Sequence, residues 1–118
     1  MTEAMGALVV FDGIVRNHDH GSAVRGLSYS AHPQAKEYIA RVVQSVADEL
    51  EGVRLWAVHR VGPIAIGESA LTVLAAAAHR GRAFEACEAV ADRVKAQVPI
   101  WKEQELTDGS TEWVGIDT

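Results

Sequence analysis

The sequence has little cysteine, no long apolar run and no leader-like N-terminus. Cys87 is the single cysteine among 118 residues, so the chain has no internal disulfide and no Cys/His set of the kind that binds structural zinc. The longest weakly polar run, residues 70–78, is half of the ~18 residues that a membrane span requires. No basic stretch precedes an apolar segment at the N-terminus, as it would in a secretory signal. We therefore expect a cytoplasmic protein with no metal site and no membrane segment.

The charge and the missing motifs exclude several further classes of protein. A formal net charge of -5 argues against a module that neutralises nucleic acid or an anionic membrane. The sequence has no Gly-rich phosphate loop, no GxSxG motif and no close pair of carboxylates, so nucleotide-binding and hydrolase templates find no support. With 48% hydrophobic residues, the chain is long enough to fold as one domain.

The hydrophobic pattern predicts two helices and several strands. Strands are expected at residues 7–15 and 24–30, paired as a hairpin, then at 53–61 and 70–78, with a closing hairpin of 100–106 and 111–115. One helix is expected over residues 35–50, and another ends near Val98, with an apolar stripe that starts at Phe84. Residues 64–68 are expected to form turns. The order of these elements predicts an α+β fold with a mixed or antiparallel sheet, not a doubly wound sheet.

Basic residues gather between positions 79 and 102. This segment holds five basic and three acidic residues, a net charge of +2 in an acidic chain. His79 and Arg80 stand where a strand gives way to a helix, whose first turn exposes unpaired N–H groups, so this turn is either an anion site or a plain polar connection. Lys95 in the last helical turn fits the helix dipole without any further role, and Lys102 alone fits a solvated strand. Their closeness in sequence makes all four candidates for one site.

Other polar positions have ordinary explanations beside functional ones. Arg16 ends an apolar strand, where it is either a charge that protects a sheet edge or a substrate anchor. His18 and His20 form a His-x-His pair without a third ligand at suitable spacing, so we expect a polar loop instead of a metal site. Cys87 falls on the apolar stripe of the second helix and is expected to be a buried hydrophobe, not a nucleophile.

Short motifs along nearly the whole chain occur together in one known family. They are Gly6-Ala7, Phe11-x-Gly13-x-Val15-Arg16-Asn17-His18, His59-Arg60-x-Gly62, His79-Arg80, Ala83-Phe84-Glu85-Ala86, Asp92-x-x-Lys95 and Pro99-Ile100-Trp101-Lys102-x-x-Glu105. With these motifs in this order, the sequence resembles the large, catalytic subunit of molybdopterin synthase. Members of that family usually carry a few tens of residues before the Gly-Ala pair, so we expect residues 1–118 to be a single, N-terminally short domain of this kind.

The resemblance implies a sulfurtransferase of molybdenum cofactor biosynthesis. Members of the family convert cyclic pyranopterin monophosphate to molybdopterin by installing two dithiolene sulfurs. A small ubiquitin-like subunit supplies the sulfur from a thiocarboxylate at its C-terminal Gly-Gly. The resemblance also implies an α/β-hammerhead fold, no cofactor beyond the pterin substrate, and a heterotetramer built on a homodimer of large subunits.

The resemblance further assigns a pocket to ten residues of this sequence. They are Phe11, Ile14, Val15, Arg16, His79, Arg80, Lys95, Lys102, Glu103 and Gln104. Arg16 and Arg80 are suited to clamp anionic oxygens of the substrate, with His79 adding a hydrogen bond. Lys95 and Lys102 are the expected catalytic residues, because an ammonium group stabilises the negative charge that develops as the thiocarboxylate attacks. The other five line the pocket, partly through backbone groups.

In a second interpretation, the chain has the same binding surface but does not catalyse the reaction. In it, the chain is a non-catalytic paralogue that binds the small sulfur carrier or an anionic metabolite, and the short N-terminus motivates it. Binding of the carrier without formation of product would distinguish this protein from the enzyme.

Overall fold

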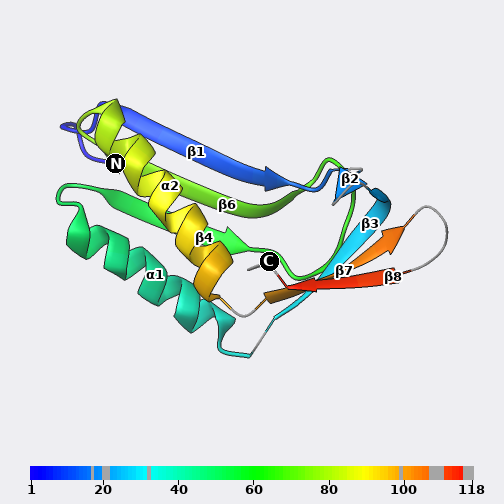
Figure 1. The fold of residues 1–118 in the computed structure, drawn as a ribbon. Coiled ribbons are helices and arrows are strands. Elements are labelled where there is room, and N and C mark those ends of the chain that lie inside the picture. The colour runs from blue at the N-terminus through cyan, green and yellow to red at the C-terminus, as the bar shows by residue number, and fades with distance from the viewer. Residues whose placement is uncertain (17, 20–21, 32, 99, 107–110, 116–118) are drawn as a thin grey trace.

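The chain folds into a helix-covered sheet from which a second sheet projects (Figure 1). A computed structural model describes the backbone of residues 1–16, 18–19, 22–31, 33–98, 100–106 and 111–115, and the side chains within 1–16 and 33–98. The elements in chain order are β1 (Ala7–Ile14), β2 (His18–Asp19), β3 (Ser22–Ala31), α1 (Ala35–Glu49), β4 (Arg54–His59), β5 (Gly62–Ile64), β6 (Ser69–Ala77), α2 (Arg80–Gln97), β7 (Ile100–Leu106) and β8 (Thr111–Gly115).

The first sheet has the strand order β1-β6-β4, and both pairings are antiparallel. Side chains alternate between its faces, so that Val9, Val73 and Leu55 turn towards the helices. Both α1 and α2 lie over this one face (Figure 1). The strand pattern predicted from alternation therefore produces a sheet with one covered and one open face.

The core between the helices and the sheet is made of small and β-branched side chains. Val46, Val73, Val90 and Val94 are its largest fully buried members. Arg93 joins the two helices at the side of this core, because its guanidinium donates to Ser45 Oγ at 2.9 Å and contacts the Glu49 carboxylate. The helix pair is thus fixed by apolar packing and by one polar bridge.

The second sheet has the strand order β2-β3-β7-β8, and β5 also pairs with β3. It projects from the helix-covered layer (Figure 1), and the chain measures 51 × 26 × 19 Å. The radius of gyration of 15.6 Å exceeds the roughly 13.5 Å expected for a compact domain of this length. A small buried cluster of Val15, Ile64 and Ala70 lies where the two sheets meet.

The structure confirms the α+β class, both helices and the hairpin of β7 and β8, and every described strand pairing is antiparallel. The prediction that the first two long strands pair with each other is wrong. β1 pairs with β6, whereas β3 pairs with β2, β5 and β7. Alternation predicts which face a side chain occupies but not which strand lies beside it, and a bulge at Gly13/Ile14 marks where the chain leaves the first sheet.

Two smaller expectations also need correction. Residues 62–64, at the boundary of the expected turns, form the short strand β5. Phe84 does not belong to the buried stripe of α2, because it is 60% exposed and the stripe begins at Ala83. One residue corresponds to about 100° around a helix, so Phe84 is turned away from the core beside its buried neighbour.

Candidate active site

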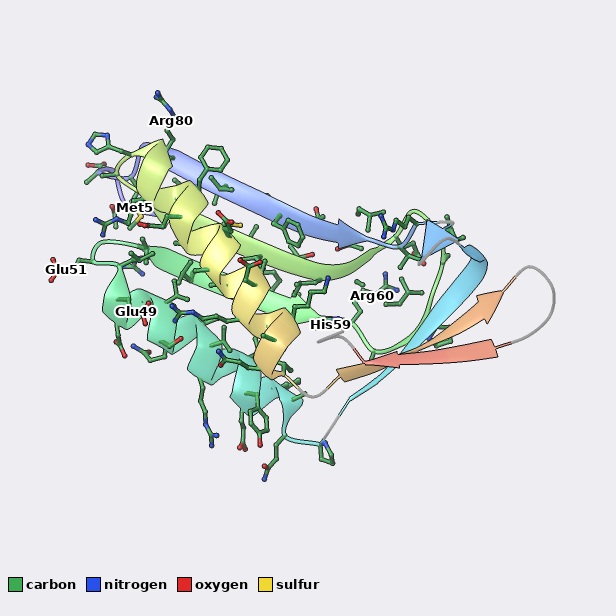
Figure 2. The ribbon with its side chains drawn as sticks, viewed as in Figure 1. Met5, Glu49, Glu51, His59, Arg60 and Arg80 are labelled. Carbon is green, nitrogen blue, oxygen red and sulfur yellow. The ribbon has the colours of Figure 1, made fainter. Side chains whose placement is uncertain are left out.

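The N-terminal end of α2 presents two of the residues predicted to bind the anionic substrate. His79 is the N-cap residue and Arg80 begins the helix, and both are exposed. No acidic residue lies in the first turn, and the cap has no side-chain hydrogen bond. The free N–H groups of this turn therefore carry the partial positive charge of the helix end. Figure 2 shows Arg80 pointing away from the body of the chain.

An open depression of about 540 Å³ lies at this end of the fold. Its lining residues are Gly6, Ala7, Ala78, His79, Arg80 and Gly81. Gly6 donates to the Ala78 carbonyl at 3.2 Å, and a Cβ added at Gly6 would lie only 3.0 Å from the same oxygen. A side chain at Gly6 would therefore require the Ala78 carbonyl to shift slightly. Arg82 turns away, because it donates to the Glu51 carbonyl at 3.0 Å and pairs with Glu85 at 3.7 Å.

Arg16 lies at the other end of β1, where the second sheet begins. The preceding residue, Val15, is only 3% exposed. Its N–H donates to Glu68 and its carbonyl accepts from Gly67, at 3.0 and 2.8 Å. These two bonds fix the chain just before Arg16, whereas Arg16 itself is exposed. Of the apolar residues predicted to line the pocket, Phe11 and Ile14 are 42% and 50% exposed, and Val15 is enclosed.

The two predicted catalytic lysines lie on either side of the junction between α2 and β7. Lys95 is exposed in the last turn of α2, between the buried Val94 and Val98. Lys102 lies in β7, opposite Tyr29 of β3 and Val114 of β8. Glu103 and Gln104 follow in the same strand. The side chains of these three β7 residues lie outside the described part, so their roles stay predictions.

One copy of the chain does not bring all the predicted residues together. Arg16 and Lys95 come from the ends of β1 and α2 that lie towards the second sheet, and Lys102 lies in that sheet, near the start of β7 (Figure 1). Arg80 and Lys95 begin and end the same helix and are separated by roughly 22 Å along its axis. His79 and Arg80 therefore lie at one end of the helix-covered layer, and the remaining cationic residues lie at the other.

His59 and Arg60 form a polar corner that the sequence marked only as part of a motif. Figure 2 shows both residues near the meeting of the two sheets. The Arg60 N–H donates to Ala70 at 2.8 Å, and its guanidinium donates to the Ser69 carbonyl at 3.3 Å and lies 3.8 Å from Glu68. His59 Nδ1 lies 2.6 Å from the Arg60 carbonyl. Because a carbonyl only accepts, Nδ1 carries the proton and donates it.

Burial of His59 predicts a dependence of stability on pH. Burial lowers the pKa of His59 from its ordinary 6.5, and the bond to the Arg60 carbonyl partly opposes this. The unfolded chain therefore takes up a proton at a higher pH than the folded chain. We expect this residue to lower the free energy of unfolding as the pH falls through about 6.5 and below. Urea unfolding from about pH 7.5 to 5 measures the effect.

The matched variants for this measurement are His59→Gln and His79→Gln. His59→Gln is expected to flatten the loss of stability in acid, whereas the exposed His79→Gln controls for the removal of an imidazole elsewhere. Equal slopes in His59→Gln and the unmutated chain would contradict a lowered pKa for the partly buried His59.

Metal and thiol chemistry gain no support from the described residues. In the part of the chain with described side chains, no three His, Cys, Asp or Glu residues gather as a metal site. His18 and His20 lie outside that part. Cys87 is buried as predicted, with its Sγ 3.9 Å from the Val73 carbonyl, and burial raises the pKa of its thiol. Within the same residues, no helix is both long and apolar enough to cross a membrane.

Comparisons of the sequence and comparisons of the fold with known proteins point to the same family. A family model described as "MoaE protein" matches residues 1–97. Molybdopterin synthase catalytic subunit 1 of Mycobacterium tuberculosis is 38% identical over 111 residues, covering 93% of this chain and 75% of that protein. The crystal structure of molybdopterin synthase from Staphylococcus aureus superposes with a TM-score of 0.90 at 34% identity, covering 98% of this chain and 84% of that chain.

A solved complex is also similar to this chain. It contains subunits 1 and 2 of the molybdopterin-converting factor of Helicobacter pylori 26695. The matching chain superposes with a TM-score of 0.75 at 27% identity, covering 95% of this chain and 73% of that chain. The fold described above therefore also occurs in a protein that assembles with another subunit.

Proposed function

Because this chain belongs to the MoaE protein family, we propose that it acts as the catalytic subunit of a molybdopterin synthase and transfers sulfur to a pterin precursor. The precursor is cyclic pyranopterin monophosphate, and the sulfur comes from the C-terminal thiocarboxylate of a small ubiquitin-like subunit. The observation that carries this proposal is the placement of the matching cationic residues at the two ends of one helix-covered layer. The reaction uses no metal or nucleotide cofactor of the chain's own.

The α2 N-terminal end supplies the anion-binding half of the site. His79 and Arg80 stand beside free backbone N–H groups, and phosphate oxygens bind well to such a helix end. A guanidinium can hold two phosphate oxygens at once, which fixes the orientation of a substrate as well as its charge. We assign the cyclic phosphate of the substrate to this end.

The end of the helix-covered layer at the junction between α2 and β7 supplies the catalytic half of the site. Lys95 and Lys102 flank the short connection between α2 and β7, and Arg16 follows β1 at the same end of the layer. As the thiocarboxylate sulfur bonds to an electrophilic carbon of the pterin, the electron pair of that carbon's C–O bond passes to the oxygen, where negative charge develops. An ammonium group held beside that charge lowers the barrier. We assign Lys102 to this role, with Lys95 beside it. Hydrolysis of the resulting thioester by water then leaves the sulfur on the pterin and releases the small subunit as a carboxylate.

The complete site requires two copies of the chain. Roughly 22 Å of helix separates Arg80 from Lys95, and Arg80 points away from the body of its own chain (Figure 2), which favours a site whose two halves come from different copies. Two copies related by a two-fold axis place the same two halves together twice, each half coming from a different copy. A homodimer therefore forms two equivalent sites, and each accepts the C-terminal tail of one small subunit to give a heterotetramer. We place this assembly in the cytoplasm, where the single unpaired Cys87 stays reduced.

Reconstitution of the reaction tests the proposed function. The purified chain is mixed with thiocarboxylated small subunit and the cyclic pterin precursor, and formation of the dithiolene product is followed. We expect product only when all three components are present. If the small subunit binds but no product forms, the chain is instead a non-catalytic carrier-binding paralogue.

A further inference from the structure

The turn at residues 65–68 connects β5 to β6 and bonds to the end of β1. Gly67 has a φ of +90°, a conformation that favours glycine, and the Glu68 N–H donates to the Ala65 carbonyl at 3.1 Å. A positive φ at the third position, together with this bond, is typical of a type II turn. The turn presents the Gly67 N–H and the Glu68 carbonyl to Val15, at 2.8 and 3.0 Å. Its shape therefore determines where the chain lies directly before Arg16.

The side chain of Glu68 braces this turn. Its Oε1 accepts from the Ala65 N–H at 2.8 Å, so the carboxylate links the last residue of the turn to the first. Its Oε2 lies 3.8 Å from the guanidinium of Arg60. The carboxylate of Glu68 thus fixes the shape of the turn and ties it to the end of β4.

Arg60 supplies a fixed base for this contact. Its N–H donates to the Ala70 carbonyl at 2.8 Å, and its carbonyl accepts from His59 Nδ1 at 2.6 Å. Its guanidinium also donates to the carbonyl of Ser69, the residue after Glu68, at 3.3 Å. Both backbone polar groups of Arg60 are therefore bonded. The motif that begins at His59 builds this base, and the proposed site does not yet give that motif a role.

The pair of Arg60 and Glu68 is poorly suited to hold the whole fold together. Their side chains are 47% and 50% exposed, and water screens an ion pair with this exposure. The separation of 3.8 Å is also longer than a direct hydrogen bond. Removal of the pair is therefore expected to leave the fold intact and to change the position of the turn.

We propose that Glu68, held by Arg60, is a positioning residue that places the guanidinium of Arg16 against the substrate. The turn braced by Glu68 fixes Val15 through two backbone bonds, and Arg16 follows Val15 directly. A small shift of the turn therefore moves the base of the Arg16 side chain. Guanidinium donors point in fixed directions, so a displacement of about 1 Å weakens their bonds to a bound molecule. The inference rests on the proposed function, in which Arg16 belongs to the site.

A double-variant cycle with Arg16 tests this role in the reconstituted reaction. Glu68→Ala is expected to lower kcat/KM for the cyclic pterin precursor about tenfold, mainly through a higher KM. Glu68→Gln keeps an oxygen that can accept from the Ala65 N–H, so we expect a smaller loss. In the Arg16→Ala chain, Glu68→Ala is expected to change kcat/KM by less than about twofold, because the side chain that it positions is gone.

Glu49→Gln is the matched control. It removes a carboxylate that contacts Arg93, at the other end of the helix-covered layer from Arg60 (Figure 2). We expect kcat/KM of this variant to stay within about twofold of the unmutated value. Circular dichroism checks that each variant is folded. If Glu68→Ala fails to fold, Arg60→Gln breaks the same contact from the other side, with the same expected loss and the same dependence on Arg16.

The outcomes separate this role from the proposed function. If the unmutated chain forms product while folded Glu68→Ala and Arg60→Gln keep full kcat/KM, the positioning role is wrong and the proposed function stands. If Glu68→Ala loses the same factor with and without Arg16, it does not act through Arg16, and the positioning role is again wrong. If the unmutated chain forms no product, the proposed function is wrong and this role falls with it.

Discussion

Lys102→Ala is expected to abolish formation of the dithiolene while the chain still folds. Lys102 lies in β7 between β3 and β8, opposite Tyr29 and Val114, and alanine keeps the backbone pairing on both sides. The variant removes an ammonium group from the proposed position of developing negative charge. Loss of one such group typically lowers turnover by about 10²- to 10³-fold. The reconstituted reaction with thiocarboxylated small subunit measures the effect directly.

Two further variants make this result specific. Lys102→Arg keeps a positive charge but changes its shape and removes a transferable proton, so partial activity would indicate an electrostatic role. Lys36→Ala removes an exposed lysine from α1, and we expect it to leave turnover unchanged. Retention of full turnover by Lys102→Ala would remove Lys102 from the chemistry, and Lys95→Ala would then be the next variant to measure.

Mixing two inactive variants is expected to restore activity. Arg80→Ala removes the anion-binding half of each site, and Lys95→Ala/Lys102→Ala removes the catalytic half. If each site takes one half from each copy, a mixed dimer contains one intact site and one site that lacks both halves. With random exchange, half of the dimers are mixed, so about a quarter of the normal number of sites is recovered. This is a large change, because each variant alone is nearly inactive.

The measurement requires that the copies exchange. The two variants are unfolded together and refolded, and turnover is compared with that of the same variants refolded separately and then combined. A mixture of Lys95→Ala with Lys102→Ala is the control, because both changes fall in the same half of the site and no intact site can form. No recovery in the first mixture, despite mixed dimers, would show that one copy holds a complete site.

Much of the fold was predictable because its elements follow simple periodicities. Apolar residues such as Ile39, Val42 and Val46 recur at three- and four-residue steps, which predicted α1, and the expected strands at 100–106 and 111–115 pair as the hairpin of β7 and β8. The pairing of β1 was not predictable in this way. The alternating side chains of β1 would suit any neighbouring strand with an apolar face. The strand that does pair with it, β6, is far from β1 in the sequence, so no local pattern identifies it.

The candidate site shows a similar division between what sequence can and cannot supply. The motifs marked Arg16, His79, Arg80 and Lys95 as residues of one pocket. The spacing of Arg80 and Lys95 on one predicted helix already implies their separation, but the motifs did not show that Arg16 and Lys102 lie at the Lys95 end of the layer. The polar corner at His59 was missed for another reason. The backbone and the side chain of Arg60 are bonded to Ser69 and Ala70 at the start of β6, and no local sequence pattern reveals this contact.

The joint between the two sheets changes how substitutions near Arg16 should be read. Val15, Ile64 and Ala70 pack at this point, and the two backbone bonds of Val15 bind β1 to the loop at Gly67 and Glu68. The joint therefore sets the angle at which the projecting sheet carries Lys102 relative to Lys95. A larger or smaller side chain at Val15 would move whole segments of the pocket without contacting substrate. Lost activity in such a variant would report a changed hinge angle between rigid parts, not a missing contact.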